Sequence, residues 1–183
     1  MTTYDRDRLN ELIREKALKF GDFTLASGKK AKFYLDCRKV TLDPQGANLI
    51  AAGMLDLIGD QLPDAVGGMA IGADPITAAV ITLAGQRELP VRGFIVRKEA
   101  KEHGTGQAVE GPVVAGDRVI IVEDVVTTGG SALKAIDRCT EFGLEVVGAL
   151  TIIDRLAGGA ERFAEKGCPL RSLFTIRDFG IED

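Results

Sequence analysis

The sequence predicts an α/β fold, with a mostly parallel central sheet flanked by helices, from three observations. Short aliphatic runs such as Val119–Val122 alternate with segments of helical periodicity along most of the chain. These runs are apolar throughout, as in parallel strands that helices cover on both faces. The 183 residues, 45% of them hydrophobic and 27% charged, suffice for one domain with a sizeable core. We therefore expect a single domain over 1–183.

An N-terminal piece, residues 1–43, is expected to precede the alternating core, residues 44–183. A helix is predicted over Asp5–Phe20, with Gly21 as its stop, because apolar residues recur at helical spacing. These apolar residues are Leu9, Leu12, Ile13 and Ala17. A basic turn and then a short strand are expected to follow, over Ser27–Lys30 and around Phe33–Asp36.

Local signals bound the elements of the core. Asp43 and Pro44 open the first core helix, where the missing N–H of a proline costs nothing. A glycine-rich loop follows the strand that begins at Ala65, and a charged loop follows the strand that begins at Val91. In chain order we expect a helix over Gln45–Gly59, a strand from Ala65, a helix over Pro75–Gln86, a strand from Val91, the strand Val119–Val122, a helix over Gly130–Phe142, a strand over Glu145–Asp154, a short helix over Gly158–Lys166 and an apolar segment over Leu170–Ile176.

Composition argues against several classes of protein. No apolar run approaches the roughly 18 residues that cross a bilayer, and the charged start MTTYDRDRLNEL lacks the apolar region of an export signal. The net charge of −4 does not favour a nucleic-acid binder. One histidine and the absence of a C-x-x-C pair argue against structural zinc. Reduced, mostly buried thiols in a cytoplasmic protein are expected at Cys37, Cys139 and Cys168.

The most informative stretch is VIIVEDVVTTGGSALKAI, residues 119–136. It places Glu123 and Asp124 just beyond a buried strand, at the edge of the sheet where ligands bind in open α/β folds. The loop Thr127–Ser131 then enters a helix N-terminus, which favours an anion. A ribose 5-phosphate satisfies both features, since its phosphate enters the loop and its hydroxyls donate to the acids. The acids are also suited to holding Mg²⁺ through water or stabilising positive charge on a sugar.

Other interpretations of this stretch are weaker. The loop lacks the lysine of a nucleotide-binding P-loop, and no G-x-G-x-x-G follows the strand as in dinucleotide-binding folds. A plain strand–turn–helix with capping threonine and serine explains an isolated TTGGS. It does not explain the two acids directly before the loop.

VIIVEDVVTTGGS resembles the phosphoribosyl pyrophosphate (PRPP) motif of type I phosphoribosyltransferases, which implies that fold. The loop RKEAKEHGTGQAVEG, residues 97–111, is charged and glycine-rich, and its cations suit a departing pyrophosphate. It is similar to the R-K-x-x-K-x-H-G lid of orotate phosphoribosyltransferases. FTLASGKKAKFYLDCR resembles the N-terminal hood of that family, and LTIIDR resembles the segment whose arginine meets the orotate carboxylate. The resemblance runs from Phe23 to Arg155.

The resemblance implies a role for each matching residue in the transfer of phosphoribosyl from PRPP to orotate during pyrimidine synthesis. Glu123 and Asp124 would bind the ribose hydroxyls, and together with Lys101 and His103 they are the expected catalytic residues. The 5-phosphate cradle would comprise Val125, Val126, Thr127, Thr128, Gly129, Gly130 and Ser131. Pyrophosphate would be held by Arg97, Lys98, Lys101 and His103. Orotate would contact Thr127, Arg155 and Tyr34, with Arg155 on its carboxylate and Tyr34 against its ring.

The same resemblance implies partners. Mg²⁺ would be carried by PRPP, and the lid would close over a neighbouring subunit's site, making the protein a homodimer. This chain departs from many members at Ala26, where they carry a lysine that touches PRPP, and at Leu35, where they carry an aromatic residue. Ile71–Asp74 stands where others offer a lysine to pyrophosphate. The departures leave pyrophosphate affinity and hood contacts open.

Two rival functions share part of the pattern. A phosphoribosyltransferase for a purine or another base would share VIIVEDVVTTGGS but lack the lid and hood motifs. A regulator that has lost catalysis usually adds a nucleic-acid-binding part, and no helix-turn-helix precedes this core. Lys101 and His103 also argue against lost catalysis. A fusion to the decarboxylase of the next step does not fit the chain length, because a (β/α)₈ barrel alone needs roughly 200 residues.

Overall fold

The computed structural model describes residues 3–24, 30–99 and 108–182. Their centre is a six-stranded sheet with the strand order β5-β4-β3-β6-β7-β8. All neighbouring strands are parallel except β4 and β5. The strands are β3 (Ala65–Met69), β4 (Arg92–Val96), β5 (Val109–Glu110), β6 (Arg118–Val126), β7 (Glu145–Asp154) and β8 (Leu170–Thr175). The predicted α/β class with a mostly parallel sheet is confirmed.

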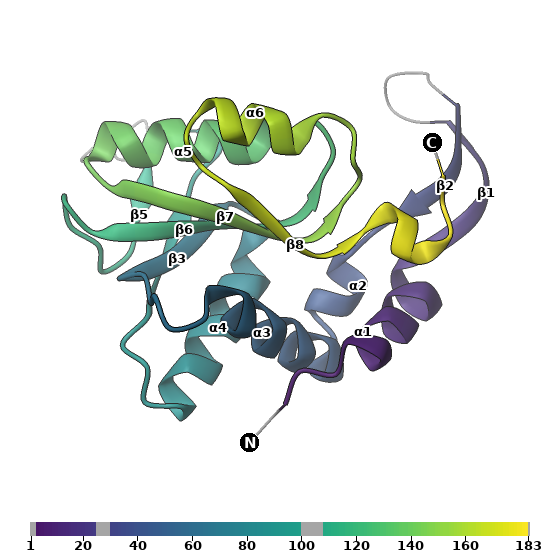
Figure 1. Ribbon diagram of the computed structural model, residues 1–183, viewed down its shortest axis with the longest axis horizontal. Helices are drawn as coiled ribbons and strands as arrows, with labels where there is room; N and C mark the ends of the chain where they lie inside the picture. The colour runs from purple at the N-terminus through teal and green to yellow at the C-terminus, as the bar shows by residue number, and fades with distance from the viewer. Residues whose placement is uncertain (1–2, 25–29, 100–107, 183) are drawn as a thin grey trace.

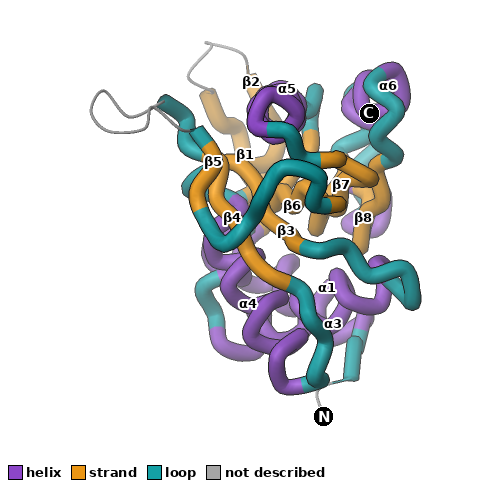
Figure 2. Tube along the Cα trace, turned by 90° about the vertical axis from the view of Figure 1, so that its left-hand side faces the viewer, coloured by secondary structure: helices purple, strands orange, loops and turns teal. Residues whose placement is uncertain are grey.

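Helices cover both faces of this sheet (Figures 1 and 2). One face carries α3 (Pro44–Ile58) and α4 (Ala73–Gln86), and the other carries α5 (Gly130–Phe142) and α6 (Gly159–Glu165). Two buried apolar clusters correspond to these layers, one with Ile50 and Ile76 and one with Ile136 and Phe163. None of the helices in the described ranges is long and apolar enough to span a bilayer.

Local signals start the first core helix as expected. Asp43 caps α3 by accepting hydrogen bonds from the N–H groups of Gln45 and Gly46, and Pro44 occupies the first turn. Helix α5 and strand β7 have the predicted bounds. The expected buried thiols are confirmed at all three cysteines.

The N-terminal prediction was partly wrong. The helix α1 (Arg6–Leu12) continues as a π-helix, η1 (Ile13–Ala17), but ends before Phe20. Leu18–Thr24 instead forms β1, which pairs antiparallel with β2 (Lys30–Leu35). The helical spacing of apolar residues stops at Ala17, and cross-strand pairing decides the conformation beyond it. Lys30 therefore belongs to β2, and the rest of the predicted basic turn lies outside the described residues.

Strand β6 is longer than predicted, and this changes where the acids lie. The ladder with β7 continues past Val122 to Val126, with Glu123 opposite Thr151 and Val125 opposite Ile153. Glu123 and Asp124 therefore lie within the strand and not beyond it. Three short elements were also not predicted, because each is too short for a periodic signal. They are α2 (Arg38–Thr41), β5 and the 3₁₀ helix η2 (Ile176–Phe179).

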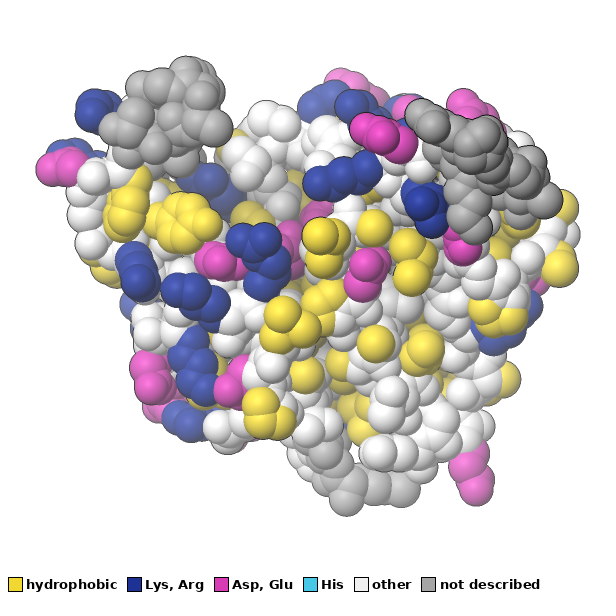
Figure 3. All heavy atoms as spheres, turned by 180° about the vertical axis from the view of Figure 1, so that it is seen from behind, with side chains coloured by type: hydrophobic (Ala, Val, Ile, Leu, Met, Phe, Trp, Pro, Cys, Tyr) yellow, Lys and Arg dark blue, Asp and Glu magenta, His cyan; other side chains and the backbone are white. Residues whose placement is uncertain are grey.

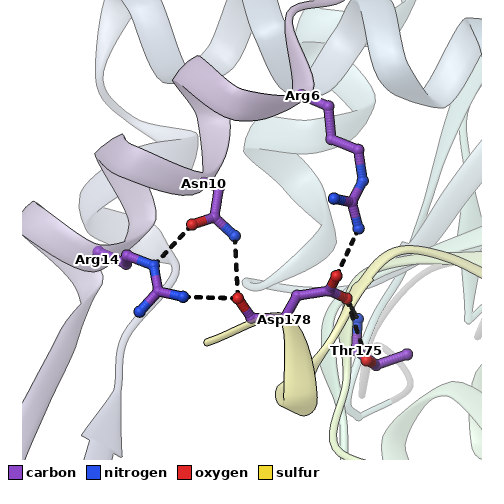
Figure 4. A network of polar contacts seen from close by, with 5 residues as sticks. All are labelled: Arg6, Asn10, Arg14, Thr175 and Asp178. Atoms are coloured by element: carbon purple, nitrogen blue, oxygen red, sulfur yellow. Dashed lines mark hydrogen bonds and ion pairs between the residues drawn. The ribbon is translucent and has the colours of Figure 1, made fainter. Parts of the chain in front are cut away.

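A polar network joins the two ends of the described chain (Figure 4). The carboxylate of Asp178 accepts hydrogen bonds from Arg6 at 2.7 Å and from the Thr175 N–H at 2.7 Å. The backbone carbonyl group of Asp178 accepts hydrogen bonds from Arg14 at 2.6 Å and from Asn10 at 3.4 Å. The N-terminal helix is thereby tied to η2, and the β1–β2 ribbon that follows it stands at one end of the core (Figure 1).

Candidate active site

The two acids converge on a space that a glycine leaves free. A Cβ atom added at Gly72 would lie 3.3 Å from both Asp124 Oδ1 and Glu123 Oε1. Backbone N–H groups orient the carboxylates: Asp124 Oδ1 accepts from Val125 at 2.8 Å, and Glu123 Oε1 accepts from Asp124 at 3.2 Å. The loop before α4 thus packs against the acids of β6.

Glu123 is a weaker acid than an exposed glutamate. Burial, followed by the negative charge of Asp124, raises the pKa of Glu123 from its ordinary value to about 8. A hydrogen bond with Asp124 also raises this pKa, whereas the charge of Lys98 lowers it. The surroundings of Glu123 therefore favour its neutral carboxyl form.

The loop after the acids forms a cavity of about 310 Å³ at the N-terminus of α5. Gly129 precedes the helix with φ +73°, in the left-handed region that glycine tolerates best. The cavity is lined by Glu123, Asp124, Val125, Thr127, Thr128, Gly129, Gly130 and Ser131. Val126 is the one member of the expected cradle that does not line it, because its side chain is buried in the core beneath α5.

This geometry is suited to a phosphorylated sugar. The unsatisfied N–H groups at the start of a 13-residue helix attract a phosphate. The acids that line the same cavity are suited to accept hydrogen bonds from hydroxyl groups. The arrangement also fits Mg²⁺, which is held by one or two carboxylates together with substrate phosphates and water, in the space that Gly72 leaves free. Within the described ranges, no group of three or more metal-ligating side chains is found.

Two of the four expected pyrophosphate residues lie at a second cavity of about 550 Å³. Arg97 and Lys98 line it together with Ala70, Ile71, Asp74, Ile95 and Glu99. Arg97 forms an ion pair with Glu110 at 3.1 Å, across the antiparallel contact of β4 and β5. Lys98 lies near enough to Glu123 to affect its pKa. Lys101 and His103 lie outside the described residues.

Arg155 reaches the N-terminal ribbon, but through a residue that was not predicted. Its N–H donates to Val126 O at 2.9 Å, and its guanidinium carbon lies 4.8 Å from the centre of the Phe33 ring. Tyr34 packs near Phe23, with ring centres 5.8 Å apart, and is 41% exposed. Successive residues of a strand face opposite sides, so Phe33 and Tyr34 lie on different faces of β2. This alternation was the signal that Phe33 belongs to a different surface from Tyr34. The role of Tyr34 against the substrate ring stays a prediction.

Comparison with known proteins agrees with this geometry. A family model described as phosphoribosyl transferase domain matches residues 44–175. An orotate phosphoribosyltransferase of Rhodopirellula baltica is 61% identical over 177 residues, which cover 93% of this chain and 92% of that protein. One from Aquifex aeolicus is 43% identical over 97% of this chain and 99% of that protein. The solved orotate phosphoribosyltransferase of Mycobacterium tuberculosis H37Rv in complex with PRPP is 36% identical, with a TM-score of 0.81, over 96% of this chain and 99% of that one.

Proposed function

The chain belongs to the orotate phosphoribosyltransferases, within the phosphoribosyl transferase family, and we propose that its site transfers the phosphoribosyl group of PRPP to orotate. The products are orotidine 5′-monophosphate and pyrophosphate, in the synthesis of pyrimidine nucleotides. The observation that carries the proposal is one cavity that is lined by two acids and by a helix N-terminus. The backbone N–H of Arg155 donates to Val126 at the end of β6, the strand that carries the acids. We further propose that residues 1–183 act as one domain, with 1–43 contributing the hood.

Each end of PRPP has its own binding group in this proposal. The 5-phosphate accepts hydrogen bonds from the loop Thr127–Ser131, where the helix dipole adds to the attraction. The ribose hydroxyls donate to Glu123 and Asp124. The pyrophosphate end lies toward Arg97 and Lys98, and the backbone N–H groups of Gly72 and Ala73 are suited to the same anion.

The transfer exchanges one bond at the anomeric carbon for another. The bond from C1 to the pyrophosphate oxygen breaks with its electron pair leaving on pyrophosphate, and positive charge develops on the ribose ring. Asp124 stabilises that charge electrostatically. The anionic ring nitrogen of orotate then forms the new bond from the opposite face, inverting C1, and no strong base is needed. Glu123 and Asp124 would hold Mg²⁺ carried by PRPP, and the ion would neutralise negative charge on the leaving group.

The first experiment is an assay with a panel of bases. Purified protein is mixed with PRPP and Mg²⁺, and pyrophosphate release is measured with orotate, adenine, hypoxanthine, uracil or nicotinate. We expect turnover with orotate alone. Turnover with another base would contradict the role of Arg155 and leave the PRPP cradle intact, whereas PRPP binding without turnover would favour a regulator.

Arg155 is expected to set the affinity for orotate. Its guanidinium matches a carboxylate in a bidentate geometry, and the Phe33 ring keeps it in place. Arg155→Ala should raise the orotate KM by roughly 10- to 100-fold, from the loss of one charge-assisted contact, with little change in the PRPP KM. Steady-state kinetics with each substrate varied in turn measures this difference. Equal increases in both KM values would contradict the carboxylate role.

We also propose a homodimer in which each lid serves the neighbouring subunit. Ile71 is 69% exposed and Ile95 is 39% exposed beside the cavity at Arg97, and hydrophobic side chains are spread over the central part of the face in Figure 3. Asp74 lines the same cavity, and among the described residues its Oδ1 atom is buried without a hydrogen-bond partner.

Mixed dimers test the shared lid. Lys101→Ala and Asp124→Asn should each lose most turnover, since one lacks the lid cation and the other lacks the site carboxylate. When the two variants are refolded together, about one quarter of the sites should combine an intact Asp124 with an intact Lys101 from the partner. Activity near that fraction is expected in the mixture. If each lid served its own subunit, the mixture would stay as inactive as its components.

The proposed location is the cytoplasm. The three buried free cysteines support it, because reduced thiols persist in that compartment.

A further inference from the structure

Arginine side chains contact the two segments that the proposal assigns to PRPP, the loop Thr127–Ser131 and the segment Arg97–Lys98. A loop that turns its N–H groups toward an anion turns carbonyl groups away from it, and those carbonyl groups need donors of their own. Here the donors include Arg162 of α6 and Arg138 of α5. Neither residue lines the cavities of the proposed site.

Arg162 supports the phosphate loop. Its Nη1 atom donates to Thr128 O at 2.6 Å, in the middle of the loop. Helix α6 also lies close against this loop, since a Cβ atom at Gly159 would come within 2.9 Å of Thr127 O. Phe163, which follows Arg162 in the chain, is fully buried beneath Gly129. Arg162 is thus the charged contact within a tightly packed support.

Arg138 supports the pyrophosphate segment. Its Nη2 atom donates to Lys98 O at 2.7 Å, and its Nη1 atom donates to Arg97 O. Both carbonyl groups lie just after β4, in the segment that directs Lys98 toward Glu123. Because α5 begins at the phosphate loop, Arg138 links that helix to the segment at the other end of PRPP.

We propose that Arg138 and Arg162 are positioning residues for PRPP, each acting on one end of the substrate. Arg162 fixes the loop that holds the 5-phosphate, and Arg138 fixes the Arg97–Lys98 segment that holds pyrophosphate. A guanidinium bound to a peptide carbonyl also polarises that peptide group, which makes its N–H a better donor on the opposite side. The inference rests on the proposed function, since it assumes where each end of PRPP binds.

Two product-like ligands separate the two roles. Binding of ribose 5-phosphate and of inorganic pyrophosphate with Mg²⁺ is measured by calorimetry for the wild type, Arg162→Gln and Arg138→Gln. We expect Arg162→Gln to weaken ribose 5-phosphate binding on the order of fivefold, the loss of one charge-assisted hydrogen bond at an exposed site, with pyrophosphate binding unchanged. Arg138→Gln should weaken pyrophosphate binding by a similar factor and leave ribose 5-phosphate binding unchanged. Arg162→Lys and Arg138→Lys should recover part of each loss, because lysine keeps a positively charged donor group but lacks the planar fork of arginine.

Arg171→Gln is the matched control. Arg171 donates to the carbonyl group of Leu57, away from both cavities, so its replacement should leave both affinities unchanged. Equal weakening of both ligands by Arg138→Gln and Arg162→Gln, or weakening of neither, would overturn the inference. A wild type that binds neither ligand would instead overturn the proposed function, so the two failures are distinguishable.

Discussion

Asp124→Asn is expected to lower kcat/KM for PRPP by roughly 100-fold or more while leaving the fold intact. The substitution removes the negative charge that faces the ribose where positive charge develops during transfer. The fold should persist because asparagine keeps an oxygen that accepts the 2.8 Å hydrogen bond from Val125. Steady-state kinetics at pH 7 and a thermal denaturation curve measure the two effects separately.

Glu123→Gln is the control at the neighbouring position. Glutamine resembles the protonated carboxyl group that burial favours at Glu123, with its pKa raised to about 8. The loss of kcat/KM at pH 7 should therefore be roughly tenfold, well below the loss at Asp124. If the two variants lost activity equally, the expected difference between the contributions of the two acids would be wrong.

Gly129→Ala is expected to lower the free energy of unfolding by about 2–4 kcal/mol. Gly129 has φ +73°, which costs energy for any residue with a Cβ atom. That Cβ atom would also lie 2.7 Å from Cε2 of Phe163, which is fully buried and cannot move away. The loop would have to shift, so the PRPP KM should rise as well.

Gly130→Ala provides a matched comparison in the same loop. Apart from its chain neighbours and the nearby backbone of α5, no atom of the described residues lies within 4 Å of a Cβ atom at Gly130, and its φ is not in the left-handed region. The same chemical change should therefore alter the free energy of unfolding by less than about 0.5 kcal/mol. Urea denaturation of both variants measures the difference. Equal destabilisation would show that the close contact with Phe163 does not limit this loop.

Sequence alone predicted the parts of the fold that depend on neighbouring residues. The start of α3 follows from Asp43 and Pro44, whose capping geometry needs only the next three residues. The bounds of α5 and β7 follow from local periodicity and glycine positions. The acids and the phosphate loop share a cavity because they are contiguous in the chain and the strand leads directly into the helix.

Contacts between distant residues decided the rest. Leu18–Thr24 is a strand because it pairs with β2, and β6 continues through the acids because β7 runs alongside it. Phe33 meets Arg155, which lies more than 100 residues later in the chain.

The energies of the site also belong to the tertiary structure. The raised pKa of Glu123 comes from its burial, and the carbonyl groups of Thr128 and Lys98 find their donors on other elements. Residue types and their spacing therefore determined the chemistry of this protein. Its charge states and supporting contacts depended on the packing of segments far apart in the chain, because desolvation and hydrogen bonding are set by whatever lies nearby in space.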